Sequence, residues 1–233
     1  MNKIILFDLD STLLQMNQDL FLKKYFGLIY SYSAKLGYNP DEFMSLFNKA
    51  AYAIVKNDGS KSNEDVFWDL IKIKYPNIEE LKIQFEKLYK TDFKKISEIV
   101  DKTDIPNLLI KELKKKGYKI ILATNPLFPA VCTYERMKWA GLDMNDFDHI
   151  TTYEDYHYCK PNHKYYEEIF EKLGLDLIGS IMVGNDLSDD FSDLPLGISK
   201  ILITDYLINT KNLPIDMPSY TLKEFLKYVI EEL

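Results

Sequence analysis

Several kinds of residue are scarce in this sequence, and each scarcity limits its function. Cysteine occurs only twice in 233 residues, at Cys132 and Cys159, which excludes a disulfide framework and indicates a reducing compartment. Arginine occurs once, at Arg136, and the 36 Asp and Glu residues outnumber the 29 Lys and Arg residues, for a formal net charge of −7. Because a nucleic-acid-binding face needs cations that neutralise phosphates, nucleic acid is not expected as a partner.

Long apolar runs are also absent. Residues 4–7 are the only apolar run before the first aspartate, which is too short for the core of a signal peptide. Nowhere does a run approach the roughly 20 residues that cross a membrane. A cytoplasmic protein without a membrane partner is therefore expected. The remaining composition, 46% hydrophobic and 28% charged, is typical of a globular domain.

Short apolar runs predict the strands of a parallel sheet. They are continuous rather than alternating and rich in β-branched residues, as is typical of strands covered by helices on both faces. The runs span residues 3–7, 119–123, 180–183 and 199–203, with a weaker strand near 149–151. Helical patterns begin near Pro106 and Pro161 and stop at Gly117 and Gly174. This alternation predicts an α/β fold with a Rossmann-like doubly wound parallel sheet.

The stretch between the first two predicted strands is too long for one crossover. Residues 15–94 show the apolar spacing of several amphipathic helices, with the clearest break at residues 57–60. We therefore predict an all-helical cap domain over 15–94, inserted into a discontinuous core made of residues 1–14 and 95–233.

Polar side chains follow three of the four apolar runs. The residues are Asp8, Asp10 and Thr12 after the first run, Thr124 and Asn125 after the second, and Asn185, Asp186, Asp189 and Asp190 after the third. Ligands of open parallel sheets bind outside the carboxyl ends of the strands, so these side chains are expected to form one site.

The residue types in this site suit phosphoryl transfer. Magnesium prefers oxygen ligands, usually one or two carboxylates with a substrate phosphate and waters. One carboxylate can attack phosphorus and form a covalent intermediate, and a second can transfer the proton. A lysine and a hydroxyl can hold the transferred oxygens and offset their charge.

In their order along the chain, these residues resemble the motifs of the haloacid dehalogenase superfamily. Asp8-x-Asp10-x-Thr12 is similar to its first motif and Thr124 to its second. Lys160, which precedes a proline, is similar to the third-motif lysine, and residues 184–190 resemble the acidic fourth motif. Within the superfamily, the chain resembles the capped small-molecule phosphatases of the phosphoglycolate phosphatase-like branch.

The resemblance implies a magnesium-dependent phosphatase that hydrolyses a small phosphorylated metabolite through a phosphoaspartate. It makes Asp8 the nucleophile and Asp10 the acid and base. Thr124 and Lys160 would be catalytic and, with Asn125, would bind the phosphoryl group. The resemblance also implies four metal ligands, Asp8, Asp10, Asp186 and Asp190, with Asp10 contributing its backbone carbonyl.

Some points stay open at this stage. The fourth motif often reads Gly-Asp, whereas Asn185 follows Gly184 here, so either Asn185 or Asp186 faces the metal. Residues 57–63 form a substrate-reading loop or an ordinary turn. Arg136 is expected in a surface ion pair. The alternatives to hydrolysis are a sugar phosphomutase of the same superfamily and a non-catalytic protein that binds a phosphorylated ligand. The substrate and the oligomeric state are not predicted.

Overall fold

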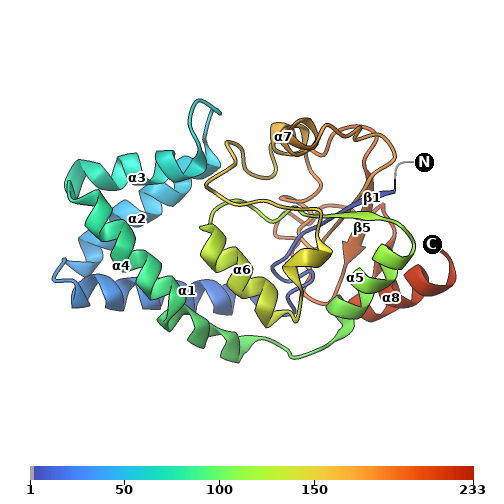
Figure 1. The fold of residues 1–233 in the computed structure, drawn as a ribbon, viewed down its shortest axis with the longest axis horizontal. Coiled ribbons are helices and arrows are strands. Elements are labelled where there is room, and N and C mark those ends of the chain that lie inside the picture. Colours follow the sequence, from blue (N-terminus) through green and yellow to red (C-terminus); the bar gives the residue numbers. More distant parts are fainter. Residues whose placement is uncertain (1–2) are drawn as a thin grey trace.

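The protein folds around a six-stranded parallel sheet, which a computed structural model describes over residues 3–233 (Figure 1). The strand order is β3-β2-β1-β4-β5-β6. The strands are β1 (Ile4–Phe7), β2 (Lys119–Leu122), β3 (His149–Ile150), β4 (Ile181–Gly184), β5 (Ser199–Ile203) and β6 (Ser219–Tyr220). The chain first builds outward from β1 through β2 to β3 and then from β4 to β6 on the other side. The strand order therefore reverses beside β1, which places its end at the crevice where such sheets bind ligands.

Five of the six strands lie where the sequence predicted them, and the predicted doubly wound sheet is confirmed. The sixth strand, β6, was not predicted. It has only two residues, and Ser219 pairs with Leu202 of β5 without any apolar run to mark it. Strands of this length are set by their neighbours rather than by a local pattern.

Helices cover both faces of the sheet. They are α5 (Ile105–Lys115), α6 (Ala130–Trp139), α7 (His163–Leu173) and α8 (Leu222–Glu231), with a short 3-10 helix η2 (Met144–Asp146). Ile5 and Phe7 of β1 pack in one core with α5, α6 and α8, while Ile4 and Leu6 pack in a second core with α7. The side chains of a strand alternate between its faces, and here both faces are buried, which explains the continuous apolar run.

A helical insert fills residues 18–99 and lies to one side of the sheet in Figure 1. Its helices are α1 (Gln18–Lys35), α2 (Pro40–Val55), α3 (Asn63–Lys74), α4 (Ile78–Lys90) and the 3-10 helix η1 (Asp92–Ile99). The side chains of Asn17, Asn39 and Ser62 cap the first three helices by accepting backbone hydrogen bonds. The predicted boundary between residues 94 and 95 lies within η1, and the division into domains stays a prediction.

The turn between α2 and α3 contacts the core. The backbone N–H of Asn63 donates to the carbonyl of Tyr156 (2.8 Å), and that of Glu64 donates to the carbonyl of Tyr153 (2.9 Å). At Gly59, where φ is +90°, an added Cβ would lie 2.1 Å from the hydroxyl of Tyr158. The turn therefore packs against residues 153–158, and its residues do not line the cavity described below.

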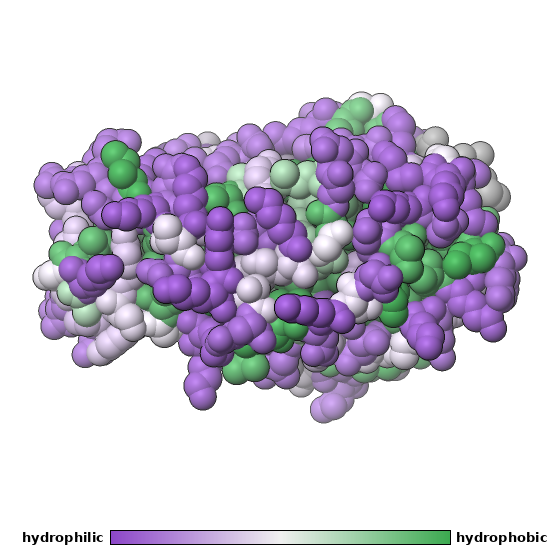
Figure 2. All heavy atoms as spheres, turned by 60° about the horizontal axis from the view of Figure 1, so that its bottom comes forward, coloured by the Kyte–Doolittle hydropathy of each residue, from purple (hydrophilic) through white to green (hydrophobic). Residues whose placement is uncertain are grey.

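Hydrophilic side chains predominate on the face shown in Figure 2, with hydrophobic ones interspersed. Across residues 3–233, every helix is too short or too polar to cross a membrane.

Candidate active site

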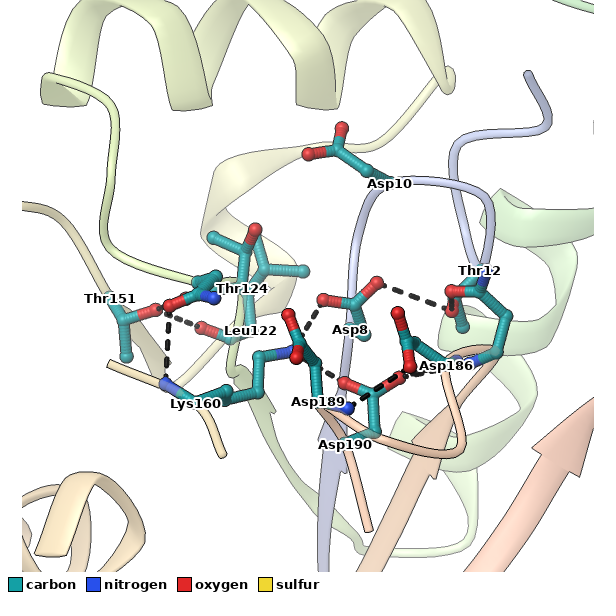
Figure 3. Close-up of polar contacts among 12 residues, drawn as sticks. Asp8, Asp10, Thr12, Leu122, Thr124, Thr151, Lys160, Asp186, Asp189 and Asp190 are labelled. Atoms are coloured by element: carbon teal, nitrogen blue, oxygen red, sulfur yellow. Dashed lines mark hydrogen bonds and ion pairs between the residues drawn. The ribbon is translucent and has the colours of Figure 1, made fainter. Parts of the chain in front are cut away.

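The carboxyl end of β1 positions Asp8 at the centre of the sheet. The N–H of Asp8 donates to the carbonyl of Val183 in β4 (2.9 Å), which holds the residue as an extension of its strand. The chain then turns tightly, with Ser11 in the left-handed region (φ 64°) and the N–H of Leu14 donating to Leu9 (2.7 Å). Through this turn Thr12 returns to the strand end, where its hydroxyl lies 3.3 Å from Asp8 Oδ2 (Figure 3).

Lys160 links two of the buried carboxylates. Its ammonium donates to Asp8 Oδ1 and to Asp190 Oδ1, both at 2.6 Å. Burial alone would lower the pKa of Lys160, but the carboxylates of Asp190 and Asp8 raise it well above its ordinary value. The lysine is therefore a fixed cation. Because one positive charge serves two carboxylates, the cluster keeps an excess of negative charge.

This excess affects Asp8 itself. Burial raises the pKa of Asp8 to about 7, and the charges of Asp190 and Asp10 act in the same direction, while Lys160 lowers it. Carboxylates are stabilised by nearby cations, so a divalent cation at this site would restore the ionised form that a nucleophile needs.

Asp190 supports the turn that follows β4. Its Oδ2 accepts hydrogen bonds from the backbone N–H groups of Asn185 and Asp186, both at 3.0 Å. A side chain at Gly184 would not fit, since a Cβ there would lie 2.2 Å from Asp190 Oδ2. With Lys160 on Oδ1, both oxygens of Asp190 are engaged by protein groups. These contacts indicate that Asp190 holds the turn after β4 and Lys160 in place rather than binding a metal directly.

The oxygen donors near Asp8 suit a magnesium ion. Asp186 uses Oδ1 to accept from the N–H groups of Ser188 (2.7 Å) and Asp189 (3.0 Å), and it lines the same cavity as Asp8. Asn185 Oδ1 accepts from the Thr12 hydroxyl (2.9 Å) and keeps a second lone pair.

Within residues 3–233, no group of three or more His, Cys, Asp or Glu side chains is arranged to hold a metal on its own. Magnesium commonly takes only one or two carboxylates and completes its shell with waters and substrate phosphate, so the donor set fits this ion.

Thr124 and Asn125 are held where the phosphoryl group is expected. The carbonyl of Thr124 accepts from the hydroxyls of Thr151 (2.7 Å) and Tyr165 (2.9 Å), and Asn125 Oδ1 accepts from the N–H of Lys160 (3.2 Å). These bonds tie the loop after β2 to the segment that carries Lys160. Sequence reasoning missed Thr151 and Tyr165, because a core-packing pattern does not reveal which hydroxyl will bond a distant carbonyl.

Arg136 corrects one expectation. It was predicted in a surface ion pair, but its side chain is fully buried and pairs with Asp10 Oδ2. The guanidinium carbon also lies 4.4 Å from the centre of the Phe128 ring, and Arg136 Nη2 donates to Thr133 Oγ1 at 3.3 Å. Arg136 falls on the buried face of α6, one turn after Cys132. Helical position therefore outweighed the usual preference of arginine for the surface.

Asp10 lies between this arginine and the cavity. Its carboxylate is turned away from Asp8 (Figure 3), and its Oδ1 is buried without a hydrogen-bond partner among residues 3–233. Burial raises the pKa of Asp10, whereas Arg136 and Lys160 lower it.

The site opens into a cavity of about 180 Å³ at the boundary between the core and α1. The cavity brings together all the predicted site residues except Thr12, which contacts Asp8 and Asn185 without lining the cavity. Its wall consists of Asp8, Asp10, Gln18, Phe21, Leu22, Thr124, Asn125, Leu127, Phe128, Lys160, Asn185, Asp186, Asp189 and Asp190.

The family of haloacid dehalogenase-like hydrolases matches residues 5–201, which is most of the chain and contains every site residue described above. The chain belongs to this family. The predicted resemblance is thereby confirmed.

Comparisons with individual proteins agree with this family assignment. This chain is 29% identical to a glyceraldehyde 3-phosphate phosphatase of Methanothermobacter thermautotrophicus over 97 residues, which span 41% of this chain and 42% of that protein. It is 23% identical to the pyrophosphatase PpaX of Bacillus cereus over 79% of this chain and 75% of that protein. The first name agrees with the predicted enzyme class, a hydrolase of phosphoric monoester bonds, and the second names a hydrolase of a phosphoric anhydride.

A solved structure shows the same fold. The haloacid dehalogenase-like hydrolase YfnB of Bacillus subtilis, described as bound to magnesium, superposes with a TM-score of 0.58 and 19% identity over 100% of this chain and 99% of that one.

Proposed function

We propose that this hydrolase cleaves small phosphomonoesters through a phosphoaspartate formed on Asp8, with magnesium as cofactor. The observation that carries the proposal is the environment of Asp8, a buried carboxylate at the end of the central strand that is paired with Lys160 at 2.6 Å and faces a small cavity. A carboxylate in a structural ion pair has no need to face such a cavity.

In the first step, an oxygen of Asp8 attacks phosphorus, the bond from phosphorus to the ester oxygen breaks, and the alcohol leaves with a proton from Asp10. In the second step, water gives its proton to Asp10 and attacks the phosphoaspartate, which frees phosphate and returns the Asp8 carboxylate. Lys160 and Thr124 hold the phosphoryl oxygens as charge moves between the two ends.

Magnesium, when bound, neutralises the phosphate and the carboxylates that surround it. Asp8, the backbone carbonyl of Asp10, and Asp186 would hold it, with the amide oxygen of Asn185 as a further donor and Asp190 behind them. The substrate is a small phosphorylated metabolite, because the cavity of about 180 Å³ is too small for a segment of protein. A cytoplasmic location agrees with two buried, unpaired cysteines.

The test measures phosphate release from p-nitrophenyl phosphate and a panel of metabolite phosphates, with magnesium and with chelator. We expect release that requires magnesium, and a loss of at least about 1,000-fold in Asp8→Asn, because a neutral amide cannot act as the nucleophile. Acid quenching during turnover should leave a protein whose mass has increased by one phosphoryl group, in the wild type only. Undiminished release by Asp8→Asn would disprove the mechanism. A hexose phosphate that is isomerised rather than hydrolysed would instead identify a phosphomutase.

A further inference from the structure

The cavity has little positive charge for a site that is to bind a phosphate ester. Among the described residues that line it, five are aspartates and Lys160 is the one cation. That ammonium already contacts two carboxylates, Asp8 and Asp190, at 2.6 Å each. The single arginine of the chain is paired with Asp10, stacks on the Phe128 ring and is not among the residues that line the cavity. A bound magnesium ion would be used by the transferred phosphoryl group, which leaves the rest of the cavity without a counter-ion.

Beyond these charged residues and the polar residues Thr124, Asn125 and Asn185 near Asp8, the wall of the cavity is largely apolar. Phe21 and Leu22 of α1 face Leu127 and Phe128 of the loop after β2, and the rings of Phe21 and Phe128 lie 5.9 Å apart. One neutral amide, that of Gln18, completes this side. An anion buried against such a wall would lose its hydration without gaining a charged partner.

We propose that this site selects phosphomonoesters whose leaving group is small and uncharged, such as a short hydroxyaldehyde or polyol, and discriminates against a second anionic group. A carboxylate beside the ester, as in phosphoglycolate, and a second phosphate, as in pyrophosphate, both belong to the disfavoured class. The inference rests on the proposed phosphatase function and adds to it the charge of the leaving group. The inference therefore predicts that this chain does not share the activity for which its pyrophosphatase relative is named.

A matched pair of substrates tests the inference. Glyceraldehyde 3-phosphate and 3-phosphoglycerate have the same three-carbon skeleton and differ in the aldehyde or carboxylate at C1. We expect kcat/KM to be at least about 100-fold higher for the aldehyde, given the cost of an unpaired buried charge. Pyrophosphate should be as poor a substrate as 3-phosphoglycerate. Comparable kcat/KM values for the two three-carbon substrates would overturn the inference, even if both reactions depended on Asp8.

A cation placed on the apolar wall should relax the selectivity. Leu22→Lys introduces an ammonium from α1 into the cavity, and we expect it to raise the ratio of 3-phosphoglycerate to glyceraldehyde 3-phosphate turnover by about 10-fold or more. Leu20→Lys adds the same charge to the same helix at an exposed position outside the cavity wall, and should leave the ratio unchanged.

The outcomes distinguish the two proposals. If no compound gives Asp8-dependent phosphate release, the phosphatase function fails. If release occurs but Leu20→Lys and Leu22→Lys change the ratio equally, the selectivity comes from the overall charge of the helical insert, and the apolar wall is not its cause. Thermal melting of both variants checks that they fold.

Discussion

The buried pair between Arg136 and Asp10 gives the sharpest prediction. Arg136→Met keeps most of the volume of the side chain but removes its charge, so Asp10 is left with no cationic partner at Oδ2 and with an Oδ1 that already lacks a hydrogen bond. Removal of one member of a buried ion pair typically costs about 3–5 kcal/mol. The Asp10 side chain keeps 19% exposure, which lets water relieve part of the cost, so we expect the free energy of unfolding to fall by about 3 kcal/mol.

Activity should fall for a separate reason. Arg136 pairs with the carboxylate that is proposed to protonate the leaving oxygen, and acid-base catalysis contributes typically about 10²–10⁴-fold. We therefore expect kcat/KM of Arg136→Met to decrease by about 10²-fold for glycerol phosphate, whose alkoxide must be protonated as it leaves. With p-nitrophenyl phosphate the decrease should be smaller, since its leaving group needs no acid. Arg136→Lys keeps the charge but loses the planar fork of donors and the stacking on Phe128. Its kcat/KM should therefore lie between those of the wild type and of Arg136→Met.

Urea denaturation and steady-state kinetics measure both effects, and a double-mutant cycle isolates the pair. In an Asp10→Asn background, Arg136→Met should cost less stability by about 1–3 kcal/mol than it does in the wild type. Lys61→Met is the matched control, because its partner Asp69 and Lys61 itself are both more than half exposed, and this pair should contribute under about 1 kcal/mol. Equal costs in both backgrounds, or equal losses with the two substrates, would refute the role assigned to Arg136.

Two further predictions concern the turn between α2 and α3 and the charge of Asp8. Gly59→Ala should destabilise the protein by about 1–2 kcal/mol or more, because φ is +90° and the new Cβ meets Tyr158, whereas Gly27→Ala inside α1, with open space around it, should stabilise it by about 0.5–1 kcal/mol. Thermal or urea unfolding of the two variants checks the opposite signs, and a shared sign would contradict the described packing. Burial raises the pKa of Asp8 to about 7, so the stability associated with its protonated form is present near pH 4 and lost as pH rises through 7. Metal-free wild type should therefore lose more stability than Asp8→Asn between pH 5 and pH 8 in urea titrations with chelator, and parallel pH profiles would rule this out.

The sequence was sufficient to predict five of the six strands and the polar residues at their ends. Buried parallel strands leave continuous apolar runs, and the polar residues that follow them must gather at one edge, so Asp8, Thr124 and Asp186 could be placed together before any coordinates. The short strand β6 could not be predicted, because its two residues pair through backbone contacts that no side-chain pattern records. The contacts of the turn near Gly59 with Tyr158 likewise depend on how the helical insert packs on the core.

The Arg136–Asp10 pair shows why side-chain partners are harder to predict than elements. The two residues lie 126 positions apart, and nothing local to either indicates the other. In the structure, Arg136 lies one helical turn after Cys132 on the buried face of α6. The general preference of charged residues for the surface pointed the opposite way, and it failed because the partly buried carboxylate of Asp10 lay within reach to compensate the charge.

Charge links the cofactor and the leaving group in one argument. Five aspartates line the cavity, and one lysine is available to offset them, yet the proposed substrate is itself an anion. A divalent cation resolves this conflict at the phosphoryl end, where Asp8, Asp186 and Asn185 offer oxygen ligands. Among the described residues, the opposite wall of the cavity offers no charged ligand, since Phe21, Leu22, Leu127 and Phe128 are apolar and Gln18 is neutral. The same distribution of charge that underlies the proposed dependence on magnesium therefore favours a neutral leaving group.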